Sequence, residues 1–288
     1  MKLSNLGLQA FAQTAITLNI TQAAKDLGLT QSALSQRIAL LENELEVTLF
    51  IREARGLKLT SAGERLLRFS SLNQKMEEEL LLELKGNKDE LAGSLRLAGY
   101  SSVLRSILIP ALSDFLRKHP KVHIDFQSYE MFELPEILNT ARADLIVMDY
   151  QWQKKGIAEV NLGSEDFVVI ESTKHDCPQD LYLDHGPLDN ATEEFFKTQT
   201  RAPKNIRRSF MGDVYGIIDG VKMGLGRAVM SRHLIQNNKQ IEIVAGYSKY
   251  KRPVTLHYFE QPYYPRLMAK VLAELEKQAP ALLVADNS

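Results

Sequence analysis

One short stretch of the sequence gathers side chains that can form hydrogen bonds with the edges of nucleic-acid bases. Thr30 is suited to cap a helix extending to about Leu45. The first turns of this helix carry amides, hydroxyls and a guanidinium on the outward face, namely Gln31, Ser32, Ser35, Gln36 and Arg37. Amides and hydroxyls can bond base edges in the major groove, Arg37 can reach guanine or phosphate, and the helix N-terminus favours a phosphate. The pattern therefore predicts a helix that binds double-stranded DNA.

Basic residues follow this helix in a predicted hairpin. Arg52, Arg55 and Lys58 surround a turn at Gly56. Side chains of this kind contact the sugar-phosphate backbone without selecting a sequence. We therefore predict a wing that holds the DNA while the preceding helix contacts the bases.

The surrounding elements are those needed to present such a helix. Thr21 can cap a helix over Gln22–Leu27, and Gly28 provides a tight break before Thr30. Apolar residues at helical spacing should face the core in the first helix (Leu8, Phe11, Ala12, Ala15, Ile16) and in the third (Ala33, Leu34, Ile38, Leu41, Leu45). A polar helix face alone is usually only a solvated face. The combined order of caps, Gly turn and basic hairpin favours a winged helix-turn-helix.

A long helix should follow, from Thr60 to about Asp89, started by a capping box of Ser61 and Glu64. Apolar residues recur along it at heptad-like spacing, with Asn73 in the same seam: Leu66, Phe69, Asn73, Met76, Leu80 and, less regularly, Leu84. Such a helix could pack on its own domain, but about 40 Å of helix exceeds what a small domain covers. We predict that it pairs with a second copy, with a hinge at residues 86–89.

The remainder alternates strands and helices in two units. Strands near 94–98, 122–128 and 145–148, with helices over 103–119 and 134–141, predict a parallel sheet covered on both faces. A second unit begins at 167–170, and 254–259 returns to the first unit, whose last helix is 266–278. We expect two α/β subdomains joined by two crossovers.

Ligands of such open sheets bind beyond the carboxyl ends of the strands. Two acidic side chains and several hydroxyls stand there, and we predict an effector pocket formed by Tyr100, Ser101, Ser102, Ser128, Tyr129, Asp149, Gly212 and Asp213. The hydroxyls and a helix N-terminus suit a carboxylate, and Asp149 and Asp213 could pair with an ammonium group. An amino acid or small organic acid is expected. Ser101 and Asp213 could also be simple helix caps.

Composition limits the possible classes of protein. The net charge of −1 is not that of a general nucleic-acid binder, and residues 1–63 carry six basic against five acidic side chains. The single Cys177 suits a reducing compartment. Neither a signal peptide nor an apolar stretch of roughly 20 residues is found, so we expect a cytoplasmic protein without membrane contact. No metal-ligand set, cofactor fingerprint or catalytic constellation is found, and we predict none.

The N-terminal run resembles the LysR-type transcriptional regulators. Its matching segments are Phe11, Ala15, Ala23-Ala24-Lys25-Asp26-Leu27, Thr30-Gln31-Ser32-Ala33-Leu34-Ser35, Ile38, Leu41-Glu42, Leu49-Phe50-Ile51-Arg52, Arg55 and Leu59-Thr60-Ser61-Ala62-Gly63. A fainter resemblance to the branch responding to arginine and lysine is carried by two runs, Ser35-Gln36-Arg37-Ile38 and Leu41-Glu42-Asn43. Three residues depart from the family pattern: Glu46 replaces a usual Gly, Asn19 a common Ser, and Ala39 an Arg that would contact phosphate.

The resemblance implies a multi-domain chain. An all-α winged helix-turn-helix (1–63) and a linker and dimerisation helix (64–90) precede an α/β effector domain like the periplasmic binding proteins (91–288). Within that domain, subdomain I comprises about 91–163 and 260–288, and subdomain II about 164–259. The implied partners are operator DNA, a small-molecule effector and further copies of the chain in a homodimer or homotetramer. The alternative is a solute-binding protein or metabolic enzyme that uses its N-terminal helices only for assembly.

Overall fold

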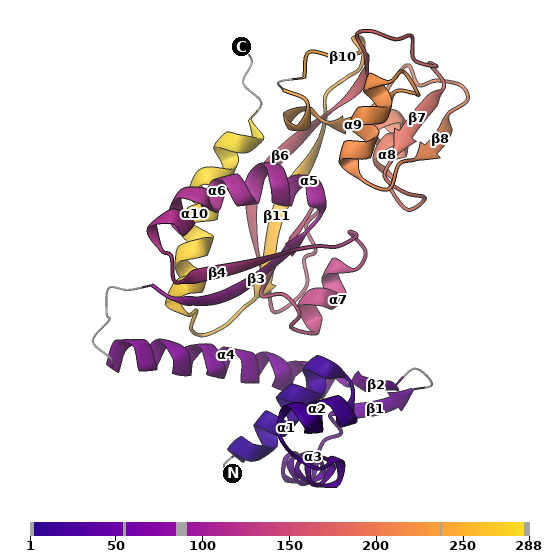
Figure 1. The fold of residues 1–288 in the computed structure, drawn as a ribbon. Helices are drawn as coiled ribbons and strands as arrows, with labels where there is room; N and C mark the ends of the chain where they lie inside the picture. The colour runs from indigo at the N-terminus through magenta and orange to yellow at the C-terminus, as the bar shows by residue number, and fades with distance from the viewer. Residues whose placement is uncertain (1–2, 54–55, 85–90, 237, 285–288) are drawn as a thin grey trace.

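A computed structural model describes residues 3–53, 56–84, 91–236 and 238–284 of the chain. A small N-terminal domain is joined by one long helix to a larger α/β domain (Figure 1). The N-terminal part consists of α1 (Asn5–Thr17), α2 (Ile20–Asp26), α3 (Gln31–Leu45), the hairpin β1 (Phe50–Glu53) and β2 (Gly56–Leu59), and α4 (Ser61–Leu84). The predicted hinge at residues 86–89 lies outside the described residues.

Short polar side chains begin the first three helices. Ser4 Oγ accepts from Gly7 N at 3.3 Å, Asn19 Oδ1 from Gln22 N at 3.1 Å, and Thr30 Oγ1 from Ala33 N at 3.2 Å. Thr30 was predicted as the cap of the third helix, and this is confirmed. The prediction that Thr21 caps the second helix is wrong, because Asn19 begins it two residues earlier.

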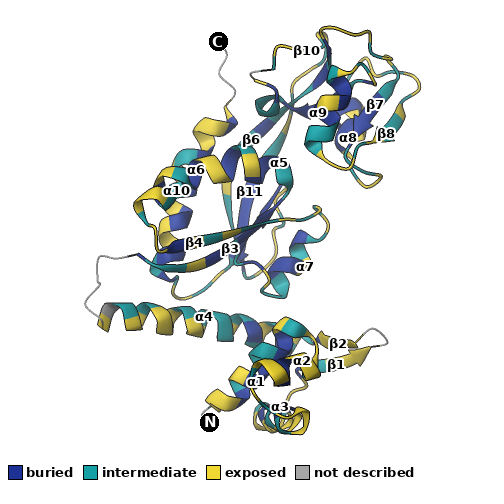
Figure 2. Cartoon of the chain, viewed as in Figure 1, coloured by how far each residue is buried: buried dark blue, intermediate teal, exposed yellow. Residues whose placement is uncertain are grey.

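Apolar residues at helical spacing form the core of this domain. In Figure 2, buried and exposed residues alternate along its helices. Phe11, Leu34 and Leu41 are each at most 1 % exposed. Ile16, predicted to face the core, is 69 % exposed because it lies on the outer side of α1. Gly28, at φ +64°, makes the break between α2 and α3. Glu46 ends α3 in the left-handed region at φ 54°, so the chain accepts the strain that a Gly would avoid.

The wing and the linker helix meet at a crowded junction. Thr60 Oγ1 donates to Thr48 O at 2.6 Å and accepts from Gly63 N at 3.0 Å. Thr60 therefore caps α4, and the predicted capping box of Ser61 and Glu64 is wrong. A Cβ on Gly63 would lie 2.3 Å from Leu49 O, so only glycine allows α4 to approach the wing this closely.

The larger domain is built on a mixed sheet. Its first unit contains β3 (Gly93–Gly99), α5 (Ser101–Val103), a π-helical turn (Leu104–Leu108), α6 (Ile109–Lys118), β4 (Val122–Ser128), α7 (Leu134–Asn139), β5 (Leu145–Met148) and α10 (Arg266–Leu283). The strands β3, β4 and β5 are parallel, as predicted. In Figure 1, α6 and α10 cover one face of this sheet and α7 the other.

Two long strands connect the units. β6 (Ile157–Ser172) and β11 (Tyr250–Phe259) are antiparallel to each other, and β11 is antiparallel to β5. The sheet is therefore not wholly parallel. The predicted strands 167–170 and 254–259 are only parts of these longer strands, which pass from one unit to the other.

The second unit contains β7 (Leu181–Asp184), α8 (Ala191–Lys197), β8 (Arg207–Phe210), α9 (Val214–Lys222), β9 (Ala228–Ser231), a 3-10 turn (Arg232–Leu234) and β10 (Ile241–Ile243). β7 and β8 are parallel, whereas β9 and β10 pair with β6. We refer to the two units as subdomains I and II; the exact boundaries given above stay predictions.

Candidate DNA-binding surface and ligand cavity

The N-terminal turns of α3 present a polar outer face. Gln31, Ser32, Ser35 and Gln36 are exposed and Arg37 is half-buried. Gln31 Nε2 donates to Thr21 Oγ1 at 2.8 Å, and the Thr30 and Ser32 hydroxyls lie 3.0 Å apart. These contacts fix the first turn of α3 against α2, while Ser35 and Gln36 stay open to a partner on the solvent side.

The wing carries exposed basic side chains beside this face. Arg52 is exposed on β1, and Lys58 Nζ lies 3.6 Å from Glu53 Oε1 with both side chains more than half exposed. Arg55 lies outside the described residues. Glu42 Oε1 accepts from Leu49 N at 2.6 Å and so holds the start of the wing on α3. A partner could therefore contact α3 and the wing together.

A cavity of about 530 Å³ lies between subdomains I and II. Six of the eight residues predicted for the effector pocket line it, namely Tyr100, Ser101, Ser102, Ser128, Tyr129 and Asp149. They lie at or just beyond the carboxyl ends of β3, β4 and β5, which meet at this edge of the sheet. The topology thus brings these six side chains together as the strand pattern predicted, although their roles in binding stay predictions.

The other two predicted residues do not line the cavity. Asp213 Oδ1 accepts from Tyr215 N at 2.7 Å and Gly216 N at 2.9 Å, so its carboxylate caps α9. Gly212 takes φ +80° in the preceding turn, with open space around its Cα. The structure corrects their placement because α9 turns its first residue, Val214, toward the cavity and not its cap.

The sequence analysis missed two charged side chains that the crossover strands bring to the cavity. Arg252 of β11 stands opposite Glu165 of β6 in the strand register. Arg252 Nη1 donates to Asp149 Oδ2 at 2.7 Å and Nη2 to Asn190 Oδ1 at 2.9 Å, which ties subdomain I to subdomain II. Only the pairing of β6 with β11 could have revealed this arrangement.

Glu165 is the most deeply buried acid of the cavity, at 1 % exposure. Its carboxylate accepts from the Tyr100 hydroxyl at 2.7 Å and lies 2.7 Å from His233 Nε2. Burial, together with the Glu165 charge, raises the pKa of Tyr100 well above its usual value, so this hydroxyl stays a donor. Tyr100 therefore belongs to a fixed polar floor.

Burial also governs the neighbouring ion pair. It raises the pKa of Asp149, with Arg252 opposing the rise. For Arg252, burial lowers the pKa, but Asp149 and Tyr250 outweigh it, and the pKa is raised overall. The guanidinium thus stays charged beside a carboxyl group that is more easily protonated than a free one.

Acidic side chains outnumber cations in the cavity wall. Glu130, Asp149, Glu165 and Asp189 line it against the single guanidinium of Arg252. On the rim, Glu130 Oε1 lies 3.6 Å from His185 Nδ1 across the two subdomains. The field inside the cavity consequently favours a positively charged group on a ligand.

The fold combines a winged helix-turn-helix, a linker helix and a two-lobed domain with a cavity between the lobes. This combination defines a class of DNA-binding protein with a ligand-binding domain. Two family models match: the bacterial regulatory helix-turn-helix protein, lysR family, over residues 7–64, and the LysR substrate binding domain over residues 88–280. The chain belongs to the LysR family.

Individual relatives agree with this assignment. The chain is 33 % identical over 138 residues to the HTH-type transcriptional activator IlvY of Haemophilus influenzae, covering 48 % of this chain and 47 % of that protein. It thus spans about half the length of the curated relative.

Solved structures share the fold. ArgP from Mycobacterium tuberculosis has a TM-score of 0.80 at 19 % identity, covering 96 % of this chain and 98 % of that one. Full-length LysG from Corynebacterium glutamicum, described with bound effector Arg, has a TM-score of 0.75 at 16 % identity, with the same coverage. These likenesses support the observed domain order.

Residues 3–53, 56–84, 91–236 and 238–284 contain neither a membrane-spanning helix nor a metal-ligand cluster. No helix there is long and apolar enough to cross a membrane. Nor does that part of the chain gather three or more His, Cys, Asp or Glu side chains in a group able to hold a metal ion.

Proposed function

We propose that this chain is a DNA-binding transcriptional regulator whose activity is set by a small molecule bound between subdomains I and II. The exposed polar face of α3, beside the basic wing of an N-terminal domain of the LysR family, carries the proposal. Membership of a family of regulators favours it over a metabolic enzyme. The wing separates it from a plain solute-binding protein.

In this proposal α3 enters the major groove. Ser35, Gln36 and Arg37 contact base edges, while Arg52, Arg55 and Lys58 contact the backbone. The N-terminal domain carries little net charge, so two or more copies must supply enough phosphate contacts together.

The linker helix α4 supports self-association. Phe69, Met76, Leu80 and Leu84 are 47, 42, 53 and 74 % exposed and lie on the predicted seam with Asn73. Exposed apolar side chains in a row mark an interaction surface. We propose that a second copy covers them, giving a homodimer or, with further contacts, a homotetramer.

The effector proposed for the cavity is an amino acid with a cationic side chain. Its carboxylate would accept from the Ser101 and Ser102 hydroxyls, and its cationic groups would lie near Asp149 and Glu165. Ser231 Oγ supplies a further group, because it is buried at the wall without a hydrogen-bond partner among the described residues. The excess of carboxylates disfavours an organic acid, and L-arginine, named as the effector in the LysG structure, is the first ligand to test.

DNA binding is tested in two steps. The wild-type chain first selects duplexes from a random library, and gel shifts over a salt series then measure its affinity for them. Arg52→Ala should weaken binding to all sequences and reduce the slope of log affinity against log salt by about one. Ser35→Ala should relax the selected sequence. The control is Arg117→Ala, since Arg117 is exposed on α6 of the larger domain. If Ser35→Ala on α3 and Arg52→Ala on the wing both bind DNA with the affinity and sequence selection of the wild-type chain, the placement of DNA on this surface is refuted.

Thermal shift and calorimetry test the effector. L-arginine at about 100 times its dissociation constant should stabilise the chain by roughly 2.7 kcal/mol, whereas glutarate should not. Ser102→Trp should abolish this shift by filling the cavity, and Asp149→Asn should weaken it. Asp219→Asn, at an exposed position on α9, is the matched control. A shift retained in Ser102→Trp would exclude the cavity as the binding site.

A further inference from the structure

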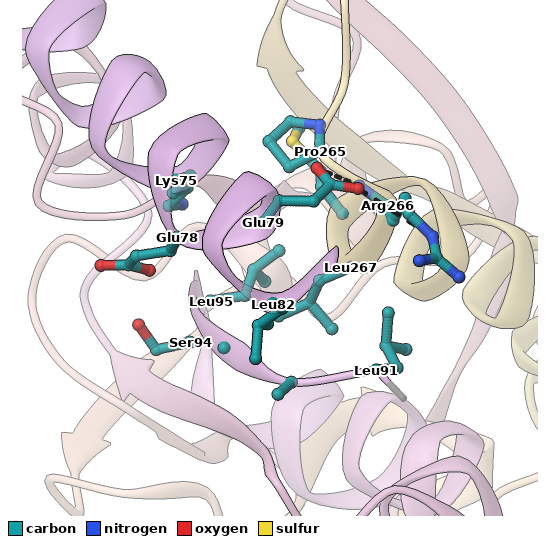
Figure 3. A pocket seen from close by; sticks show the side chains of 13 residues that line it. Lys75, Glu78, Glu79, Leu82, Leu91, Ser94, Leu95, Pro265, Arg266 and Leu267 are labelled. Carbon is teal, nitrogen blue, oxygen red and sulfur yellow. Dashed lines mark hydrogen bonds and ion pairs between the residues drawn. The ribbon is translucent and has the colours of Figure 1, made fainter. Parts of the chain in front are cut away.

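The linker helix has a second, polar face that lies on the effector domain of the same chain. Arg68, Lys75 and Glu79 are seven and four residues apart, so they share one side of α4. In Figure 3, Glu79 points toward Pro265 and Arg266 at the start of α10, while the neighbouring Glu78 points away. We call these three residues the docking face.

Lys75 forms the most enclosed contact of the docking face. Its Nζ lies 2.7 Å from Asp144 Oδ1, with the two side chains 21 and 11 % exposed. Asp144 also accepts from Arg96 N at 2.8 Å on β3. Burial raises the pKa of Asp144, but Lys75 and Arg96 together lower it below its usual value. A charged carboxylate therefore joins α4 to the sheet of subdomain I.

Glu79 supplies a cap that α10 lacks. Pro265 precedes α10 and provides no side-chain cap. The Glu79 carboxylate accepts from Arg266 N at 3.3 Å and from the Tyr263 hydroxyl at 2.9 Å. An acid at a helix N-terminus bonds free N–H groups and complements the helix dipole. The linker helix thus completes a helix of another domain.

Arg68 makes the third contact, near the DNA-binding domain. Its Nη1 donates to Asn139 O at 3.1 Å, and its guanidinium lies 4.1 Å from the centroid of the Phe259 ring. The docking face therefore engages the start of β5, the end of β11 and the start of α10.

Two of these attachment points lie at the ends of β5 and β11 remote from the cavity, since β5 ends at the cavity and β11 begins there. Asp144 and Asp149 flank the four residues of β5, all 0 % exposed, and so lie about 17 Å apart along an extended chain. On the neighbouring strand β11, Arg252 lines the cavity and Phe259 lies under Arg68. The Asp149–Arg252 pair and the docking face are thus joined by two hydrogen-bonded, buried strands.

We propose that Arg68, Lys75 and Glu79 are positioning residues that fix the DNA-binding domain relative to the effector cavity and transmit ligand binding to it. The transmission rests on the proposed function above, whereas the docking itself does not. A ligand that competes with Arg252 for Asp149 pulls on one end of β5 and β11, and the docking face moves with the other end. Packed strands shift as units and do not deform continuously, so the angle of α4 follows.

Docking is tested by the distance between two spin labels in the full-length chain. With Cys177→Ser, nitroxides are placed on cysteines introduced at the exposed Asn43 of α3 and Lys118 of α6, and labelled chain is diluted with unlabelled chain. Wild type should give one narrow distance distribution. Lys75→Met with Glu79→Gln should broaden it at least twofold. The matched pair Arg65→Met with Glu78→Gln removes the same charges, one positive and one negative, from exposed positions of α4 and should leave the distribution unchanged.

Transmission is tested on the duplex selected by the wild-type chain. The Lys75→Met, Glu79→Gln variant should bind it at least fivefold more weakly, because a loosely held domain must be ordered on binding, and L-arginine should no longer change that affinity. The single variant Lys75→Arg, which keeps the positive charge and leaves Glu79 in place, should bind the duplex and respond to L-arginine as the wild-type chain does.

The outcomes separate the two proposals. A narrow distribution in the docking variant, or DNA affinity and ligand response equal to wild type, overturns this inference. A wild-type chain that binds neither duplex DNA nor L-arginine overturns the proposed function and the transmission, while the spin-label distances still decide whether the docking face holds the domain.

Discussion

Replacing Gly63 by Ala tests whether the junction between the wing and α4 depends on close approach. Gly63 lies in the first turn of α4, where a Cβ would stand 2.3 Å from Leu49 O and 2.8 Å from Leu59 Cδ2. Leu49 O cannot easily retreat, because it accepts from Thr60 N at 3.0 Å and holds the wing to the helix. The substitution must therefore push α4 away from the wing.

Two opposing effects set the size of the change. Helix propensity alone favours Ala over Gly by about 1 kcal/mol. Overpacking costs about 1–3 kcal/mol, and weakening a buried carbonyl hydrogen bond adds about 1 kcal/mol. We expect a net loss of about 2 kcal/mol, which lowers the melting temperature of a domain this small by about 10 °C.

Calorimetry of the full chain measures this loss. The only tryptophan, Trp152, lies in the effector domain, so its fluorescence should report an unchanged transition there. Gly7→Ala is the matched control, since a Cβ on Gly7 of α1 would meet Leu41 Cβ at an ordinary 3.4 Å. If Gly63→Ala melts at the wild-type temperature or above, or shifts no more than Gly7→Ala, the steric argument is refuted.

Three further predictions concern one helix cap, one contact between α3 and the wing, and one buried histidine. Thr30→Ala should destabilise the N-terminal domain by about 1 kcal/mol and weaken DNA binding, because the first turn of α3 loses its cap; thermal unfolding and gel shifts measure both. Glu42→Gln should cost about 1 kcal/mol by removing the charge from the 2.6 Å bond to Leu49 N, visible in the same calorimetric transition. Burial lowers the pKa of His257 below its ordinary 6.5, although the Glu159 charge opposes this change. The unfolded state therefore binds more protons than the folded state, and the free energy of unfolding decreases as the pH drops below about 6.5. His257→Phe should reduce the decrease in melting temperature between about pH 7 and pH 5. An unchanged dependence of melting temperature on pH would show that other groups cause it.

Local signals predicted the N-terminal domain well. The Thr30 cap, the outward face of α3 and the buried Leu34 and Leu41 each depend on residues within a few positions, and helical spacing alone fixes which side they occupy. The errors were also local. Thr21 and Ser61 are good caps by type, but Asn19 and Thr60 stand at the residue where the chain first turns helical.

The ligand cavity was only partly predictable. Side chains following β3, β4 and β5 could be placed because parallel strands end at one edge of a sheet. Glu165 and Arg252 could not, since they stand 87 positions apart in numbering and meet only through the register of β6 and β11. Asp213 was placed in the cavity because it precedes a helix of the second unit, yet its carboxylate caps that helix, α9.

The sequence by itself determined the kind of protein, because helix caps, apolar spacing and the polar face of α3 are written in neighbouring residues. The tertiary structure alone decided which charges meet. Glu79 reaches the start of α10 and Lys75 reaches Asp144 only because the chain returns to α4 after more than sixty residues, and no local spacing encodes such a contact. Pairings of that kind are set by the packing of whole elements, whose free energy is shared among many side chains.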